Sequence, residues 1–162
     1  MKRLLIYGNS GTGKSTLAKK LAQENDLPLL DLDTLAWSEP GVRESEETSL
    51  AKLRSFCDAN EFWIIEGCYG SMIKELAQFC TELHFLNPGI EASLENNAMR
   101  PWEPHKYESL SVQNQHFEKL QEWVKLYKDR DDEFSYRYHR SIFRKFSGTK
   151  YEHTSLGNHG AQ

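Results

Sequence analysis

The residues from Gly8 to Ser15 have the types and the spacing of a phosphate-binding loop. The pattern G-x-x-x-x-G-K-[ST] is met at every defined position by Gly8-Asn9-Ser10-Gly11-Thr12-Gly13-Lys14-Ser15. Glycines let backbone N–H groups turn inward around phosphate oxygens, and the N-terminus of a following helix adds partial positive charge. Lys14 is expected to reach the β- and γ-phosphates and the Ser15 hydroxyl to bind Mg²⁺. The sequence therefore predicts a nucleoside triphosphate site, with ATP as the expected nucleotide. The expected nucleotide-binding residues are Gly8, Ser10, Gly11, Thr12, Gly13, Lys14, Ser15 and Thr16.

Carboxylates follow two further apolar runs of the chain. Asp33 comes just after the run 27–32, and Glu66 follows four apolar residues at 62–65. In open α/β sheets ligands bind at the carboxyl ends of the strands. Asp33 is thus a candidate for orienting or deprotonating an acceptor hydroxyl, or else it caps the following turn. Glu66 is a candidate for holding a Mg²⁺-bound water, or else it anchors a neighbouring helix or loop.

Strands and helices alternate through the first two thirds of the chain. Strands are expected at 4–7, 27–32, 62–65 and 83–86, and helices after residue 14, at 46–58, at 72–80 and after residue 89. This alternation predicts a single three-layer α/β/α domain over 1–153 with a parallel sheet, the P-loop NTPase fold. The expected strand order is 2-3-1-4, with a possible fifth strand that the sequence does not locate. Residues 154–162 are expected to form a disordered tail.

The last third of the chain carries a different pattern. Two prolines interrupt 100–107, so a lid is expected at about 100–110, followed by helices at 112–128 and 135–146. The last helix places Arg137, Arg140 and Arg144 on one side. Arg137 and Arg140 either contact an anionic substrate or ATP phosphates, or they belong to a solvated face. On that face their partners would be Asp129, Asp131, Asp132 and other acids.

The pattern of motifs narrows the class of nucleotide enzyme. Neither N-K-x-D nor D-x-x-G occurs in the chain, which argues against a GTPase of the Ras type. With Asp31-Leu32-Asp33 at the end of the second strand, the phosphate-binding loop resembles that of shikimate kinase and its relatives. The resemblance implies that Asp31 helps to hold Mg²⁺ and that Asp33 meets the acceptor hydroxyl. Arg100-Pro101 resembles the start of that family's lid, whose arginine contacts ATP phosphates and can stabilise transition-state charge.

A second resemblance concerns the residues around the expected acceptor. Residues 27–37 and Trp63-Ile64-Ile65-Glu66-Gly67-Cys68-Tyr69 are similar to adenylate-kinase-related "topology modulation" ATP-binding proteins. Trp37 and Tyr69 follow strand ends and are expected to wall an acceptor pocket, although aromatic residues also serve as core filler. Glu66-Gly67-Cys68 stands where shikimate kinases present three glycines, so the acceptor stays open.

These features predict a Mg·ATP-dependent phosphotransferase that acts on a hydroxyl of a small anionic or polar metabolite, with Lys14, Asp33, Glu66 and Arg100 as its catalytic residues. One alternative is a nucleoside or nucleoside-monophosphate kinase. A second is an ATP-binding regulatory module that hydrolyses ATP slowly and has no small-molecule acceptor.

The bulk composition agrees with such an enzyme. The chain has 162 residues and a formal net charge of −4, which argues against nucleic acid as a main partner. The first apolar run is far too short for a signal segment or a membrane span. Three cysteines without a C-x-x-C pair favour free thiols in a reducing compartment. The expected location is the cytoplasm, with the protein either a monomer or a homodimer.

Overall fold

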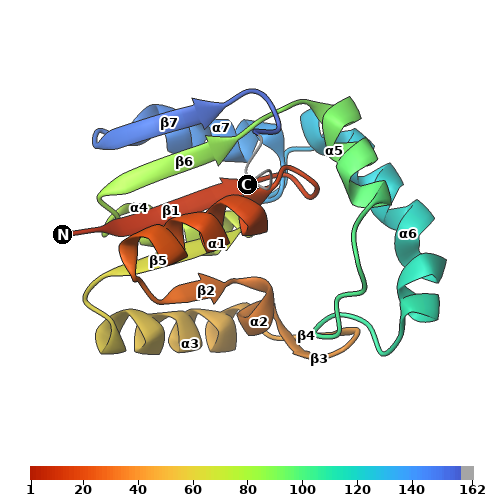
Figure 1. The fold of residues 1–162 in the computed structure, drawn as a ribbon, viewed down its shortest axis with the longest axis horizontal. Coiled ribbons are helices and arrows are strands. Elements are labelled where there is room, and N and C mark those ends of the chain that lie inside the picture. The colour runs from red at the N-terminus through yellow and green to blue at the C-terminus, as the bar shows by residue number, and fades with distance from the viewer. Residues whose placement is uncertain (158–162) are drawn as a thin grey trace.

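A five-stranded parallel sheet forms the centre of the molecule (Figure 1). The computed structural model describes residues 1–157. In their order across the sheet the strands are β2 (Leu29–Asp31), β5 (Trp63–Gly67), β1 (Arg3–Gly8), β6 (Glu82–Leu86) and β7 (Thr149–His153). All neighbouring pairs are parallel. The first four strands of this sheet along the chain, β1, β2, β5 and β6, thus have the predicted order 2-3-1-4, and the predicted fold class is confirmed.

The fifth strand, β7, lies at the edge of the sheet. It pairs with β6 from Glu82↔Thr149 to Leu86↔His153. Its sequence, Thr-Lys-Tyr-Glu-His, contains no apolar run, and its residues are exposed or half-buried. An edge strand needs a partner for its backbone but little apolar surface, which explains why hydrophobic pattern alone did not locate it.

Helices cover both faces of the sheet. These helices are α1 (Lys14–Asn25), α3 (Glu46–Ala59), α4 (Gly70–Ala77) and α7 (Tyr136–Lys145). Successive residues of β1 point to opposite faces. Leu4 and Ile6 pack in one cluster with Leu17 of α1. Leu5 and Tyr7 belong to the larger cluster, to which α3, α4 and α7 contribute. The core therefore lies on both sides of β1, and the loop that follows this strand has a rigid base.

Two more helices extend beyond the carboxyl ends of the strands (Figure 1). They are α5 (Ile90–Ala98) and α6 (Leu110–Lys125), the latter followed by a 3₁₀ turn, η1 (Leu126–Lys128). Residues 99–109 connect them without helix or strand. This connection coincides with the segment in which a lid was expected. The helix expected at 112–128 begins two residues earlier and tightens into the 3₁₀ turn at its end.

The sequence reading differs from the structure after β2. No helix or strand was expected between residues 33 and 45, but the structure has a short helix and a hairpin there: α2 (Asp33–Ala36), β3 (Trp37–Glu39) and β4 (Val42–Arg43). The antiparallel hairpin turns at Pro40-Gly41, where Gly41 has φ of 78°. Strands of two or three residues are too short for a periodic signal, which explains why this hairpin was not predicted.

The helix α4 also begins earlier than the predicted 72–80, and it ends at Ala77. Its first residue is Gly70, a residue type that disfavours helix interiors and so conceals the start. A Cβ atom at Gly70 would lie 2.1 Å from the backbone oxygen of Glu133, so glycine is required by the close approach of that chain segment. Within residues 1–157, no helix is long and apolar enough to cross a membrane.

Candidate active site

The phosphate-binding loop joins β1 to α1 and packs tightly against α5. Gly11 has φ of 81°, and a Cβ atom there would lie 2.2 Å from the backbone oxygen of Ser93. Inside the loop, the Thr12 hydroxyl donates to the Asn9 carbonyl over 2.9 Å. Because both glycine conformation and close packing are built in, the loop is held in shape by the protein itself.

Lys14 and Ser15 open the helix α1 and face the strand ends. The Lys14 ammonium donates to the backbone oxygen of Asn9 (Nζ–O 2.6 Å), and burial lowers the pKa of Lys14. The Ser15 hydroxyl donates to Glu66 Oε1 over 2.7 Å. The two loop residues with predicted roles on phosphate and on metal thus lie beside the predicted acid.

Asp31 ends β2 and Glu66 is the last residue but one of the adjacent strand β5, and their Cα atoms are register partners. Glu66 is 3% exposed. Burial, together with the charge of Asp31, raises the pKa of Glu66 to about 7, although Lys14 acts in the opposite direction. Burial and the charge of Asp33 also raise the pKa of Asp31. Carboxylates crowded in this way are typical of a site that receives a cation.

The donor atoms present suit magnesium. Ser15, Asp31 and Glu66 offer hydroxyl and carboxylate oxygens, the ligands that Mg²⁺ prefers. In addition, one ligand atom each of Asp31, Asp33 and His105 lie within 4.8 Å of one another. His105 Nε2 is 3.8 Å from Asp31 Oδ2 and 3.9 Å from Asp33 Oδ2. These residues therefore fit a divalent cation at the carboxyl ends of β2 and β5.

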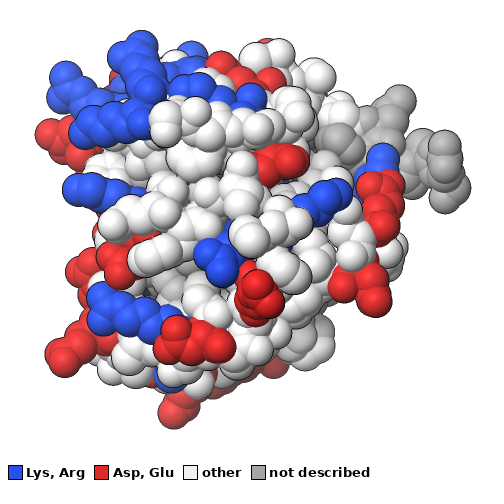
Figure 2. Space-filling model, turned by 90° about the vertical axis from the view of Figure 1, so that its left-hand side faces the viewer, with Lys and Arg blue, Asp and Glu red and all other residues white. Residues whose placement is uncertain are grey.

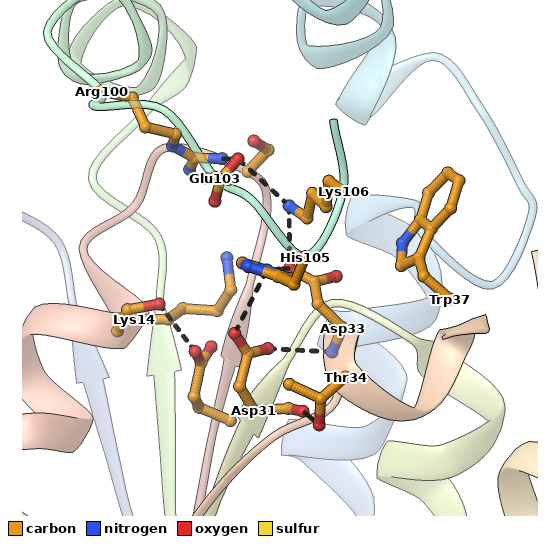
Figure 3. A network of polar contacts seen from close by, with 12 residues as sticks. Lys14, Asp31, Asp33, Thr34, Trp37, Arg100, Glu103, His105 and Lys106 are labelled. Atoms are coloured by element: carbon orange, nitrogen blue, oxygen red, sulfur yellow. Dashed lines mark hydrogen bonds and ion pairs between the residues drawn. The ribbon is translucent and has the colours of Figure 1, made fainter. Parts of the chain in front are cut away.

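Asp33 has three side-chain partners, Tyr69, Lys106 and His105, of which Figure 3 labels Lys106 and His105. Its Oδ1 accepts from the Tyr69 hydroxyl over 2.5 Å, and its Oδ2 lies 2.8 Å from Lys106 Nζ. Tyr69 in turn accepts from Trp37 Nε1 over 3.1 Å. Burial alone would raise the pKa of Asp33, but His105 and Lys106 hold it well below its usual range. Asp33 is therefore ionised at neutral pH, and because its lowered pKa makes it a weak base, it suits orienting a hydroxyl better than removing its proton.

The connection between α5 and α6 contributes a chain of charges above these carboxylates (Figure 3). Arg100 Nη1 lies 3.5 Å from Glu103 Oε2, and the same oxygen lies 3.5 Å from Lys106 Nζ. The segment is pinned to α6, because Gln113 accepts from the Glu103 backbone N–H and donates to the Pro101 carbonyl. Arg100 and Lys14 line the same cavity.

All these groups surround one cavity of about 1080 Å³. A volume of this size accommodates a nucleotide together with a small second substrate. The predicted site residues that line it are Ser10, Gly11, Gly13, Lys14, Ser15, Thr16, Asp31, Asp33, Trp37, Glu66, Tyr69 and Arg100. Gly8 and Thr12 belong to the same loop but do not line the cavity.

Comparison with known proteins assigns the chain to a family. Residues 4–84, half of the chain, match the model of the family described as "ATPase family associated with various cellular activities (AAA)". The chain belongs to this family of P-loop ATPases. This match confirms the prediction that the chain is a P-loop protein.

Three curated proteins with similar sequences are shikimate kinases. The shikimate kinase of Pseudomonas savastanoi pv. phaseolicola is 33% identical over 81 residues, covering 41% of this chain and 45% of the relative. That of Pseudomonas syringae pv. tomato is 35% identical over 74 residues, covering 37% and 41%. The chain thus spans less than half the length of the curated relatives it matches.

Solved structures share the fold over nearly the whole chain. Shikimate kinase from Acinetobacter baumannii in complex with shikimate has a TM-score of 0.56 at 14% identity, covering 98% of this chain and 89% of that one. Deoxyadenosine kinase from M. mycoides with bound dATP has a TM-score of 0.51 at 12% identity, covering 97% and 93%. At these identities the comparison shows a common fold.

Arg137 and Arg140 are not brought to the cavity of this P-loop ATPase. Arg140 Nη1 donates to Glu152 Oε2 of β7 over 2.9 Å, and its guanidinium lies 5.0 Å from the centre of the Phe85 ring. Arg137 is exposed on α7. Figure 2 shows the face at the amino ends of the strands, where Lys and Arg side chains gather at the level of α7 and β7. The expected partners on a solvated face were Asp129, Asp131, Asp132 and other acids, and Arg140 pairs with one of those other acids, Glu152.

Some cavity residues were missed by the sequence reading. Glu103, His105 and Lys106 belong to the segment recognised as a lid, but no role was predicted for them. The signal was present as three charged or titratable residues within four positions of a proline-interrupted loop. Arg43 was also missed, and its guanidinium lies 5.3 Å from the Trp37 ring centre and 5.0 Å from that of Tyr69.

Proposed function

We propose that this protein is a Mg·ATP-dependent kinase that phosphorylates a hydroxyl of a small acceptor molecule. The observation that supports it best is that one cavity is lined both by the phosphate-binding Lys14 and Ser15 and by the ionised, hydrogen-bonded Asp33. A nucleotide-hydrolysing module needs only the first group. The second group provides a place for an acceptor hydroxyl next to the γ-phosphate.

In the proposed reaction the acceptor oxygen forms a bond to the γ-phosphorus, and the bond from this phosphorus to the β–γ bridging oxygen breaks. ADP and the phosphorylated acceptor are the products, and the hydroxyl proton leaves to solvent. Lys14 and Arg100 neutralise charge on the phosphates, and Asp33 accepts a hydrogen bond from the hydroxyl and aligns it. Ser15, Asp31 and Glu66 would hold magnesium, which supplies further charge neutralisation when bound.

A nucleoside or nucleotide acceptor is the second candidate. Trp37 and Tyr69 both line the cavity, and Arg43 stacks on their rings. Such a wall suits a flat ring as well as a polar metabolite. The deoxyadenosine kinase that shares the fold binds dATP, which makes this class worth testing beside shikimate.

The test is ADP release by the purified protein with Mg·ATP, alone and with a panel of acceptors. The panel contains shikimate, nucleosides, nucleoside monophosphates, gluconate and phosphorylated sugars. We expect one class to accelerate ADP release, and we expect Lys14→Ala to abolish it. If ATP binds but no acceptor raises the slow background rate, the kinase proposal fails and the regulatory ATPase takes its place.

A further inference from the structure

Lys106 occupies an unusual position for a loop lysine. Only 15% of its side chain is exposed, and its ammonium lies between Asp33 Oδ2 at 2.8 Å and Glu103 Oε2 at 3.5 Å. The backbone around it is also fixed. The Lys106 N–H donates to the Glu103 carbonyl, and the Lys106 carbonyl accepts from the Gly41 N–H over 2.9 Å. Lys106 therefore ties the loop 100–107 both to Asp33 and to the β3–β4 hairpin.

The contact with Asp33 has a direct geometric consequence. Each oxygen of the Asp33 carboxylate is held by one donor, Tyr69 on Oδ1 and Lys106 on Oδ2. Together these two donors fix the orientation of the carboxylate. Because a carboxylate oxygen can accept a second hydrogen bond, Asp33 can still accept one from an acceptor hydroxyl. Aligning a reactant in this way is one of the larger contributions that an enzyme makes to rate.

We propose that Lys106 is a positioning residue, whose ammonium fixes the Asp33 carboxylate for the acceptor hydroxyl and thereby keeps the loop 100–107 closed over the acceptor side. This inference rests on the proposed kinase function. It assigns a role in the reaction to a loop lysine outside the phosphate-binding motif. Glu103 holds the ammonium from its other side and is shared with Arg100, so the same loop spans the nucleotide and acceptor parts of the cavity.

The kinetic test compares Lys106→Met with Lys106→Arg, using the acceptor that the panel identifies. Loss of a charge-assisted contact to Asp33 is expected to lower kcat/KM for the acceptor about 10- to 100-fold, with KM for ATP changed less than about 3-fold. Lys106→Arg is expected to recover most of the loss. The control is Lys74→Met, an exposed lysine of α4 that does not line the cavity and is expected to behave like the wild type. Equal loss for both substrates, or no recovery with arginine, would overturn the proposal.

A second test needs no acceptor and is independent of the kinase proposal. Deuterium uptake of peptides covering 99–109 is measured for the wild type, Lys106→Met, Asp33→Asn and the double variant. Each single variant is expected to exchange faster than the wild type. The double variant is expected to exchange no faster than the faster single one, because both remove the same contact. Additive effects, or unchanged exchange in Lys106→Met, would show that this contact does not hold the loop.

If the panel finds no acceptor, the kinase proposal fails, whereas this measurement still decides whether Lys106 acts through Asp33.

Discussion

Several ionisable side chains in this site are buried or half-buried, and Glu66 is the clearest example. The residue is 3% exposed, and its carboxylate accepts from the Ser15 hydroxyl and has its pKa raised to about 7. A buried acid of this kind carries a charge that the fold alone compensates only in part. The missing compensation is what a magnesium ion beside the phosphates would provide.

Replacement of Glu66 by glutamine tests this role at the residue scale. The amide keeps an oxygen to accept from Ser15 but removes the charge, so Mg²⁺-dependent ADP release is expected to fall about 10- to 100-fold. At pH 8 the variant is expected to be at least as stable as the wild type, since an uncompensated buried charge has been removed. ADP release against Mg²⁺ concentration and thermal melting measure the two effects.

The matched control is Glu108→Gln, because Glu108 also lines the cavity. It is expected to leave the Mg²⁺ dependence unchanged. A Glu66→Gln variant with the Mg²⁺ dependence of the wild type would show that this carboxylate is only a structural anchor for α1.

At the scale of elements, the phosphate-binding loop depends on its fit against α5. The loop comes within contact distance of the backbone of Ser93, and the Asn96 side chain donates to the Gly11 carbonyl over 3.0 Å. The helix α5 thus supports the loop from outside the motif. Gly11 is required both by its backbone conformation and by its packing against α5. A comparison with Gly41, whose φ is similar, separates the two effects on stability.

Gly11→Ala and Gly41→Ala form this pair. Both positions have positive φ, 81° and 78°, but nothing lies within 4 Å of a Cβ atom at Gly41. Gly41→Ala is expected to lower the free energy of unfolding by about 1 kcal/mol through backbone strain. Gly11→Ala is expected to lower it by about 2 kcal/mol more, because its methyl group overlaps the Ser93 carbonyl. Urea denaturation measures both values, and equal losses would contradict the packing argument.

At the scale of the whole molecule, a buried histidine links the C-terminal helix to the sheet. His139 of α7 is fully buried, and its Nε2–H donates to the Cys68 carbonyl over 2.9 Å. Its Nδ1 accepts from the Tyr127 hydroxyl over 2.8 Å. Burial lowers the pKa of His139 to about 3. The folded state therefore keeps this ring neutral while the unfolded chain takes up a proton below its ordinary value of 6.5.

This difference predicts a loss of stability on acidification. The contribution of His139 is fully present above pH 6.5 and declines as the pH falls from 6.5 toward 3. The expected slope is up to about 1.4 kcal/mol per pH unit. Urea denaturation between pH 7.5 and 5 measures it, with His139→Gln as the comparison. The variant is expected to lose this part of the slope, and an unchanged slope would assign the acid sensitivity to other groups.

Much of this architecture could be predicted from local sequence. The loop from Gly8 to Ser15 is defined by its own residues, because glycine conformations and a helix start are local properties. The apolar runs of β1, β5 and β6 predict a buried parallel sheet for the same reason. The edge strand β7 could not be located, since its stability comes from pairing with β6 rather than from its own composition.

In the candidate site too, some positions could be predicted from local sequence and others could not. The sequence by itself determined that Lys14, Ser15 and Glu66 lie at the carboxyl ends of neighbouring strands, because parallel strands bring such positions to one edge. Only the tertiary structure decided that Lys106 meets Asp33, although the two are 73 positions apart in the chain, and that Arg140 is held by Glu152 away from the cavity. Contacts of that kind depend on where a loop and an edge strand come to rest, which no local pattern of residue types encodes.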